Sequence, residues 1–216
     1  MSTTTTTADD TRTRVLHAAG SVFAEKGFQA ATVREICQVA GVNLASVNYH
    51  FGDKQQLYHE TVRAAHRLTA QQVPMPSWSD DVQPRDQLRG FIRTMLTRML
   101  GAQSAPWQSR LMTREVLQPT AACKELVEEN FRPHFQMLVE IIKRLAPVDT
   151  PPPQLHKMAF SVVGQCLFYR VAGEVVVLMV GEDESRSHHS IDQLAEHIAA
   201  FTLAALCGGE PGGTSL

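Results

Sequence analysis

The stretch TVREICQVAGVNLASVNYHFGDK, residues 32–54, predicts two short helices joined by a tight turn. Thr32 and Glu35 have the spacing of a capping box, in which the hydroxyl accepts a first-turn N–H and the carboxylate reaches back. Gly41 can end the first helix, because glycine adopts the left-handed conformation without a Cβ penalty. Asn43 can cap the second helix. We therefore predict a helix-turn-helix, a motif whose second helix enters the DNA major groove.

Two further helices are predicted on either side of this motif. Apolar residues recur at helical spacing over about residues 11–26, and Gly27 follows as a terminator. Asp53 and Gln56 form another capping pair, which opens a helix over about residues 54–71. The first helix of the motif is expected to bury a small apolar face made of Ile36, Val39 and Ala40.

The same stretch resembles the DNA-binding part of the TetR family of bacterial repressors. The residues that carry the resemblance are Thr32, Glu35, Ile36, Ala40, Gly41, Val42, Tyr49, His50, Phe51, Gly52, Asp53 and Lys54. One departure is Asn48, which stands where many members have tyrosine. The resemblance implies an all-α homodimer, in which the last two helices of each subunit form a four-helix interface. It also implies a ligand cavity in the C-terminal domain.

A set of DNA contacts follows from this resemblance. Arg34 would reach a base edge, where a guanidinium can contact guanine, although a lone arginine of this kind is ordinarily a solvated charge. Ser46, Tyr49 and Lys54 would bind phosphates, which position a protein without specifying sequence. His50 would read a base or a phosphate, or else serve as a cap or core histidine. The complete predicted DNA-binding set is Thr32, Arg34, Leu44, Ala45, Ser46, Tyr49, His50 and Lys54.

Composition indicates a globular protein with a sizeable core. Hydrophobic residues make up 44% of the 216 residues, and the formal net charge is −2. Residues 1–70 contain seven basic and six acidic side chains, which is a weak basic footprint for a DNA-binding module. No apolar run approaches the ~18 residues of a membrane helix. The start does not resemble a signal peptide, and the four cysteines are widely spaced. We expect a cytoplasmic protein without metal, cofactor or membrane partner.

The C-terminal two thirds are also predicted to be helical, after a proline-containing break at residues 73–84. Expected helices cover about residues 85–100, the segment between Pro106 and Pro119, and residues 120–145, 154–180 and 188–207. Pro133 should kink or split the third of these, and residues 181–187 read as a charged loop. The fold class is thus all-α with about nine helices. The predicted domains are a disordered tail (1–10), a DNA-binding domain (11–70), a ligand-binding and dimerisation domain (71–208) and a flexible tail (209–216).

Short signatures in this region are similar to the CecR branch of TetR repressors. They are REVLQPT at residues 114–120, GQCLFYR at 164–170 and EHI at 196–198. An arginine in an apolar helix is expensive to bury unpaired, so Arg170 is expected to pair with a carboxylate, for which Glu115 is the candidate. Whether that pair lines a pocket or only joins two helices is left open. The predicted ligand-binding residues are Met112, Glu115, Phe131, His134, Cys166, Tyr169 and Arg170.

The last helix carries apolar residues at alternating spacings of three and four. That spacing is typical of a helix packing nearly parallel to a partner, and it predicts a dimer seam. The predicted interface residues are Ile191, Leu194, Ile198 and Phe201.

No nucleotide-binding, zinc-protease or hydrolase motif is found in the sequence. The favoured hypothesis is a non-enzymatic repressor that binds a palindromic double-stranded operator as a homodimer and is released by an apolar or aromatic effector. The alternative is a small-molecule carrier or enzyme with a vestigial helix-turn-helix. A third reading is a helix-turn-helix used for protein docking. The sequence leaves open whether such a regulator represses or activates.

Overall fold

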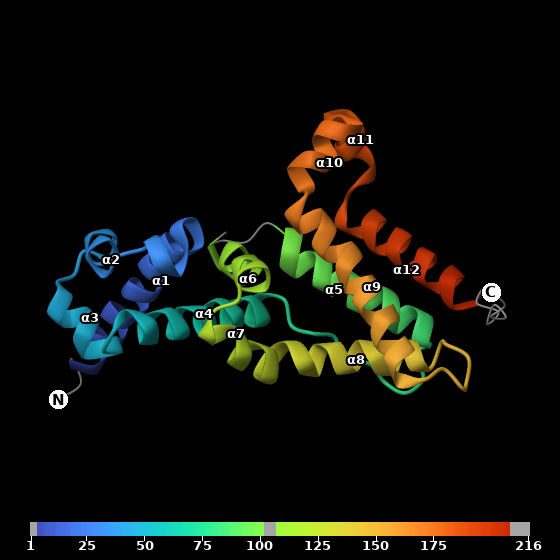
Figure 1. Ribbon diagram of the computed structural model, residues 1–216, viewed down its shortest axis with the longest axis horizontal. Coiled ribbons are helices and arrows are strands. Elements are labelled where there is room, and N and C mark those ends of the chain that lie inside the picture. Colours follow the sequence, from blue (N-terminus) through green and yellow to red (C-terminus); the bar gives the residue numbers. More distant parts are fainter. Residues whose placement is uncertain (1–3, 102–106, 208–216) are drawn as a thin grey trace, which may run out of the picture. The chain divides into compact units, whose positions relative to one another are not determined.

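The structure, a computed structural model, describes residues 4–101 and 107–207, and in these residues the regular secondary structure is helical (Figure 1). The predicted all-α class is therefore confirmed. The described residues divide into two units. Unit 1 contains the residues up to Gln72 together with Trp107–Glu129, and unit 2 contains Val73–Gly101 and the residues from Asn130 onward.

Unit 1 is built around the two longest helices of the N-terminal part. Its elements are α1 (Thr4–Ala30), α2 (Val33–Ala40), α3 (Leu44–Phe51), α4 (Lys54–Gln72), α6 (Trp107–Leu117) and α7 (Ala121–Leu126). α1 packs against α2, α4 and α6, and α4 also packs against α3, α6 and α7. Phe23, Ile36, Leu57 and Tyr58 are fully buried at the centre. The helix-turn-helix is thus held on a small core of its own.

The predicted caps of the motif are confirmed. Thr32 accepts a hydrogen bond from the N–H of Glu35 at 3.2 Å, and Asn43 accepts one from Ser46 at 2.8 Å. Asp53 caps α4 in the same way through Gln56, at 2.8 Å. Gly41 ends α2 in the left-handed conformation, with φ 65° and ψ 38°.

Three details of unit 1 differ from the expectations. The capping box is only half formed, because the Glu35 carboxylate pairs with Lys26 at 2.6 Å. Val39, which was expected to be buried, is 60% exposed. Cys37 is buried instead, beside Ile36 and Ala40 on α2. α1 begins at Thr4, within the tail predicted to be disordered, whereas residues 1–3 lie outside the described part. The predicted stop at Gly27 is confirmed by its non-helical φ of 75°.

Unit 2 is organised around α5 (Pro84–Leu100). Its other helices are α8 (Arg132–Lys143), α9 (Pro152–Val171), α10 (Gly173–Val180), α11 (Glu182–His188) and α12 (Ile191–Cys207). α5 packs against α8, α9 and α12, and its residues Leu88, Ile92 and Leu96 are fully buried. Phe91 joins them in the same core.

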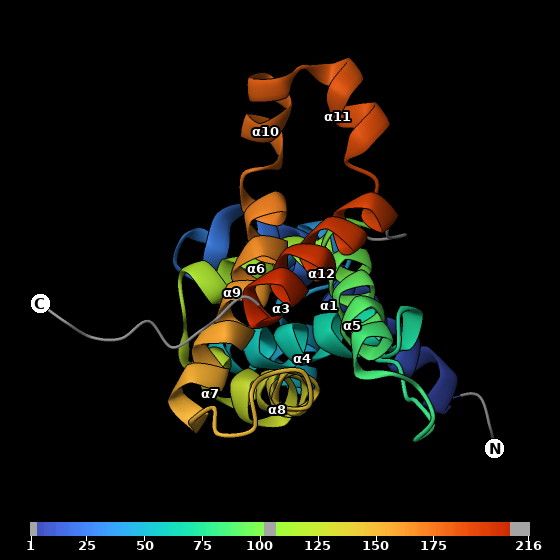
Figure 2. The same cartoon turned by 90° about the vertical axis from the view of Figure 1, so that its right-hand side faces the viewer.

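The long predicted helices are interrupted. A π-helical turn, η1 (Val127–Phe131), precedes α8, so the helix predicted over residues 120–145 is split just before Pro133. The helix predicted over residues 154–180 is bent by 76° between α9 and α10. The loop predicted at residues 181–187 is instead α11. Both views show α10 and α11 standing away from the rest of unit 2 (Figures 1 and 2).

No helix in the described part is both long and apolar enough to cross a membrane alone. α9 and α10 together reach the required length and composition, but only across their 76° bend.

The predicted domain boundary after residue 70 lies close to the change of unit after Gln72. α6 and α7 were assigned by sequence to the second domain, yet they pack against α1 and α4 in unit 1. The tail predicted at 209–216 lies outside the described residues. The functional assignment of the predicted domains stays a prediction.

Candidate nucleic-acid interface

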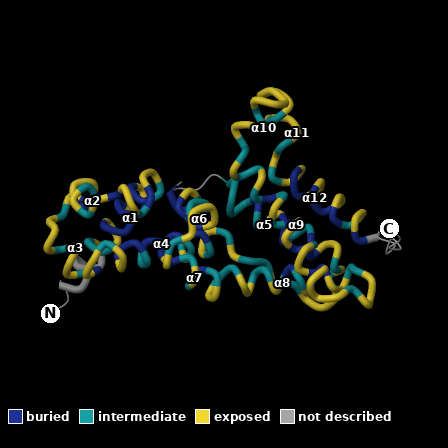
Figure 3. Tube along the Cα trace, viewed as in Figure 1, coloured by how far each residue is buried: buried dark blue, intermediate teal, exposed yellow. Residues whose placement is uncertain are grey.

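The residues predicted to contact DNA lie at the surface of α2, α3 and the start of α4. α3 turns Val47 and Phe51 inward, one helical turn apart, and both are buried. Its remaining side chains are exposed or half-buried (Figure 3). The exposed members of the predicted set are Thr32, Arg34, Leu44, Ala45 and Tyr49, and the half-buried ones are Ser46, His50 and Lys54. Their contact with DNA stays a prediction.

Tyr49 is the most conspicuous of these side chains. It is 84% exposed, and the edge of its ring meets His50 at a centroid distance of 5.1 Å. An exposed aromatic ring gains little from the protein core, so packing does not explain its presence. Its hydroxyl is in a position to bind a partner outside the subunit.

The ion pairs in the described part of unit 1 leave two of the predicted DNA-contacting cations without a carboxylate partner. Glu60 binds Arg12 at 2.6 Å and Arg63 at 2.8 Å, so one carboxylate pairs with two cations. Within the described residues, no carboxylate forms an ion pair with Arg34 or Lys54. Neither cation is therefore neutralised by an ion pair in the part of the chain that the structure describes.

Lys54 has contacts that the sequence did not reveal. Its Nζ donates to the backbone carbonyl of Gln29 at 3.2 Å and lies 4.7 Å from the centroid of the Phe28 ring. These contacts tie the first residue of α4 to the end of α1. A change in the position of Phe28 or Gln29 would therefore also change the position of the Lys54 side chain.

The predicted ligand residues divide between the two units. Met112 and Glu115 lie on α6 in unit 1, and the others lie in unit 2: Phe131, His134, Cys166, Tyr169 and Arg170. Glu115 is fully buried and accepts hydrogen bonds from Tyr58 Oη and from Thr120 Oγ1. Those two partners were not anticipated. The predicted pairing of Glu115 with Arg170, and the ligand role of all seven residues, stay predictions.

Burial changes the chemistry of two groups in these regions. Tyr58 is held in the core of unit 1, where burial and then its hydrogen bond to Glu115 raise the pKa of its phenol. Cys166 is 1% exposed in the core of unit 2, and burial raises the pKa of its thiol to about 12. Both groups therefore stay protonated near neutral pH. In the described residues, no three His, Cys, Asp or Glu side chains come together as a metal site.

The structure places two of the four predicted dimer residues inside the subunit, and the dimer interface itself stays a prediction. Leu194 and Ile198 are buried, at 3% and 0% exposure, in the core that α12 shares with α5. The regular spacing on α12 thus reflects packing inside the subunit. Ile191 is partly buried against the same core, whereas Phe201 is 60% exposed. The exposed large apolar residues of α9, α10 and α12 are Phe160, Phe168, Val171, Val175, Leu178, Met179, Val180 and Phe201.

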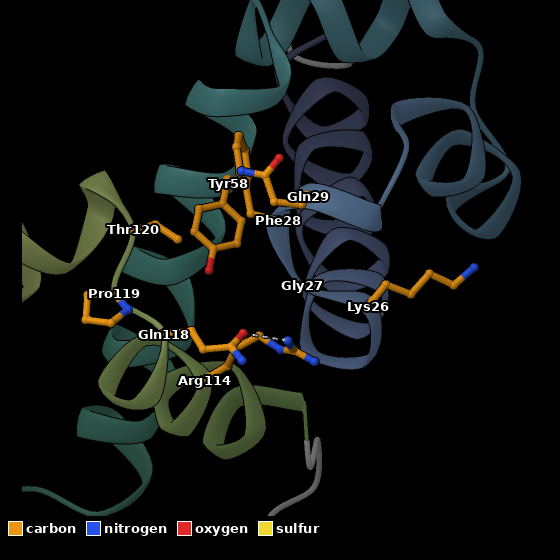
Figure 4. Close-up of a pocket in the computed structure, with 9 residues that line it drawn as sticks. All are labelled: Lys26, Gly27, Phe28, Gln29, Tyr58, Arg114, Gln118, Pro119 and Thr120. Atoms are coloured by element: carbon orange, nitrogen blue, oxygen red, sulfur yellow. Dashed lines mark hydrogen bonds between the residues drawn. The ribbon is translucent and has the colours of Figure 1, made fainter.

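Unit 1 contains a pocket that the sequence analysis missed. It has a volume of ≈ 310 Å³ and opens between the end of α1, the first turns of α4 and the turn from α6 to α7 (Figure 4). Its lining residues are Lys26, Gly27, Phe28, Gln29, Tyr58, Arg114, Gln118, Pro119 and Thr120. They come from segments distant in sequence, which is why no local motif indicated the pocket.

Comparison with known sequences identifies relatives of both parts of the chain. Residues 15–61 match the family of bacterial regulatory proteins of the tetR type. Residues 84–206 match the C-terminal domain of the HTH-type transcriptional dual regulator CecR. The CecR dual regulator of Shigella flexneri is 27% identical over 188 residues, which are 80% of this chain and 81% of that protein. The repressor KstR2 of Rhodococcus jostii is 40% identical over 62 residues, 26% of this chain and 30% of that protein.

Solved structures with the same fold cover nearly the whole chain. A TetR-like transcriptional regulator from Rhodococcus sp. RHA1 has a TM-score of 0.69 at 17% identity, over 92% of this chain and 97% of that chain. AibR, solved in complex with isovaleryl coenzyme A and operator DNA, has a TM-score of 0.63 at 17% identity, over 91% of this chain and 97% of that chain. At such identities the likeness concerns the fold.

Proposed function

Because the chain belongs to the TetR family of transcriptional regulators, in the branch defined by the CecR C-terminal domain, we propose that it is a ligand-responsive repressor. It binds a palindromic operator in cytoplasmic double-stranded DNA as a homodimer, and a small molecule releases it. The observation that carries this proposal is the exposed α3 with its intact caps and the uncompensated cations Arg34 and Lys54.

The contact proposed for each residue on DNA follows from the chemistry of its side chain. Arg34 lies exposed near the start of α2, and its guanidinium can donate two hydrogen bonds to guanine in the major groove. Tyr49, Ser46 and Lys54 are assigned to phosphates, which fix the orientation of α3. Leu44, at the start of α3, is 46% exposed and suits a thymine methyl group.

Dimerisation is proposed through the outward apolar surface of α9, α10 and α12. Leu178 and Met179 on α10 are 84% and 77% exposed, and Phe160 and Phe168 on α9 are also in solvent. Several large apolar side chains in solvent on these three helices suit an interaction site. A two-fold dimer would hold two DNA-reading units about 34–36 Å apart, which is one turn of the double helix.

Release by an effector requires a ligand that prefers the dimer geometry unable to bind the operator. The solved structure of AibR, in complex with isovaleryl coenzyme A and operator DNA, supports a small molecule and operator DNA as the two kinds of ligand for a protein of this fold. An apolar or aromatic effector suits the methionine, phenylalanine and leucine side chains of unit 2. Linkage then demands that operator and effector weaken each other's binding by the same factor.

The test is selection of DNA ligands from a random double-stranded pool by the purified protein. We expect enrichment of a palindrome whose half-sites are about 10 base pairs apart, with affinity that falls steeply as salt rises. Enrichment of no sequence would overturn the proposal. In that case a carrier or enzyme with a vestigial helix-turn-helix becomes the better reading. Affinity for a candidate effector, measured with and without the selected palindrome, tests release separately, and equal values would exclude it.

A further inference from the structure

The pocket of unit 1 combines one uncompensated cation with aromatic walls. Arg114 donates from Nη1 to Gln118 Oε1 at 3.3 Å and from Nη2 to the Glu25 carbonyl at 3.1 Å. Both acceptors are neutral, and no carboxylate of the described residues pairs with this guanidinium. A guanidinium without a negative partner is the natural anchor for a carboxylate or phosphate.

The other charged groups near the pocket already have ion-pair or hydrogen-bond partners. Lys26 pairs with Glu35 at 2.6 Å, and its side chain extends away from the other lining residues (Figure 4). The Glu115 carboxylate is buried beneath Tyr58 and Thr120, which supply its hydrogen bonds. An anion in the pocket would therefore meet Arg114 without displacing an existing acid.

The walls determine the shape of the ligand. Phe28 and Tyr58 meet edge to face with centroids 5.0 Å apart, and both line the pocket together with Pro119. Gly27 keeps the space beside the cation open, because a Cβ at this position would lie 2.8 Å from Arg114 Nη1. Aromatic surfaces beside a planar fork of donors suit a flat molecule that ends in a carboxylate.

We propose that this pocket binds a small aromatic carboxylate, with Arg114 holding the carboxylate and Phe28 and Tyr58 contacting the ring. The regulatory part of the inference rests on the proposed function and uses a different route from an effector in unit 2. Phe28 and Gln29 line the pocket and also hold Lys54, the predicted phosphate contact. A ligand that displaces Phe28 would withdraw Lys54 from the DNA and lower operator affinity.

Binding is tested without DNA, using 4-fluorobenzoate as the probe and its fluorine NMR signal as the readout. We expect saturable binding to the full chain, and affinity at least about tenfold lower for the neutral analogue 4-fluorobenzamide. Arg114→Gln should reduce benzoate affinity by about tenfold or more. Arg114→Lys should have an affinity between those of Arg114→Gln and the unaltered protein, because lysine keeps the positive charge but lacks the paired N–H donors of the guanidinium. Arg110→Gln changes an exposed arginine one turn earlier on α6 and serves as the matched control.

Two results would overturn the proposal: no saturable benzoate binding to the unaltered protein, or equal binding by the Arg114→Gln and Arg110→Gln variants. Circular dichroism of each variant establishes that it is folded. The effect on DNA is measured afterwards with the selected palindrome. Benzoate should weaken operator binding by the unaltered protein but not by Lys54→Ala. Because the pocket is tested in the absence of DNA, a failure to bind any operator would refute the proposed function and leave the binding result standing.

Discussion

The indole ring of Trp107 packs directly on the backbone of Gly20. A Cβ built at residue 20 would overlap three carbons of the ring, so only glycine lets α6 approach α1 this closely. The same indole meets the edge of His17 at a centroid distance of 5.7 Å. This contact fixes α6 against α1.

Gly20→Ala is expected to destabilise the protein even though alanine is the better helix former. The helix propensity gained is about 1 kcal/mol, and overpacking in a closed core costs about 1–3 kcal/mol. Gly90→Ala is the matched control, because a Cβ there would lie 3.4 Å from Trp78, in ordinary contact. Urea unfolding should show a lower midpoint for the first variant and an equal or higher midpoint for the second. Equal midpoints for Gly20→Ala and the unaltered protein would show that α6 can shift to accommodate the added methyl group at little cost in stability.

Phe201→Glu is expected to give a folded monomer, because this side chain is 60% exposed on the proposed dimer surface. Ile198→Glu, three residues earlier, should instead give unfolded or insoluble protein, since that residue is fully buried. Light scattering combined with circular dichroism separates the two results. A Phe201→Glu protein that stays dimeric would move the interface away from this part of α12.

Lys54→Ala is expected to weaken binding to all DNA sequences alike and to lower the salt slope by about one unit. Arg34→Ala should cost about 1–3 kcal/mol at the operator and relax one base position. Binding measured against the selected palindrome and single-base variants checks both. An unchanged base preference in Arg34→Ala would remove this residue from base recognition.

The stability of the protein is expected to fall as pH rises above about 9, in part through Cys166. The folded thiol has a pKa of about 12, against an ordinary value of 9.0 for the exposed thiol. The contribution of Cys166 is complete below pH 9 and diminishes between 9 and 12, because only the unfolded chain then releases the proton. The slope approaches about 1.36 kcal/mol per pH unit. Denaturant titrations at a series of pH values give the free energy of unfolding as a function of pH. Between pH 9 and 12 this free energy should fall less steeply with pH for Cys166→Ala than for Cys123→Ala or the unaltered protein.

The local features of unit 1 were predictable because their determinants lie within four residues of one another. Thr32, Asn43 and Asp53 each cap a helix through a backbone N–H three residues later, and Gly41 needs only its own dihedral freedom. The same holds for the split before Pro133. The all-α class and the family followed from these short-range signals.

The remaining features depend on tertiary packing that spacing alone does not determine. The seam on α12 was assigned to a partner, but Leu194 and Ile198 pack inside the subunit against α5. The 3-4 spacing is the same for both kinds of neighbour. The contact of Glu115 with Tyr58 joins residues 57 positions apart, and the pocket beside it depends on that approach. Sequence patterns thus located the helices better than the faces they share.

The bend after α9 has a consequence for the divergence of related regulators. Neither α10 nor α11 contains a buried residue, so substitutions there leave the core of unit 2 intact. On the proposed dimer surface, selection on Leu178 and Met179 would then act through self-association rather than through folding. After gene duplication, two copies could change these positions and cease to form mixed dimers while both still fold. Substitutions in α10 and α11 are therefore a route by which paralogues can stop forming heterodimers with one another.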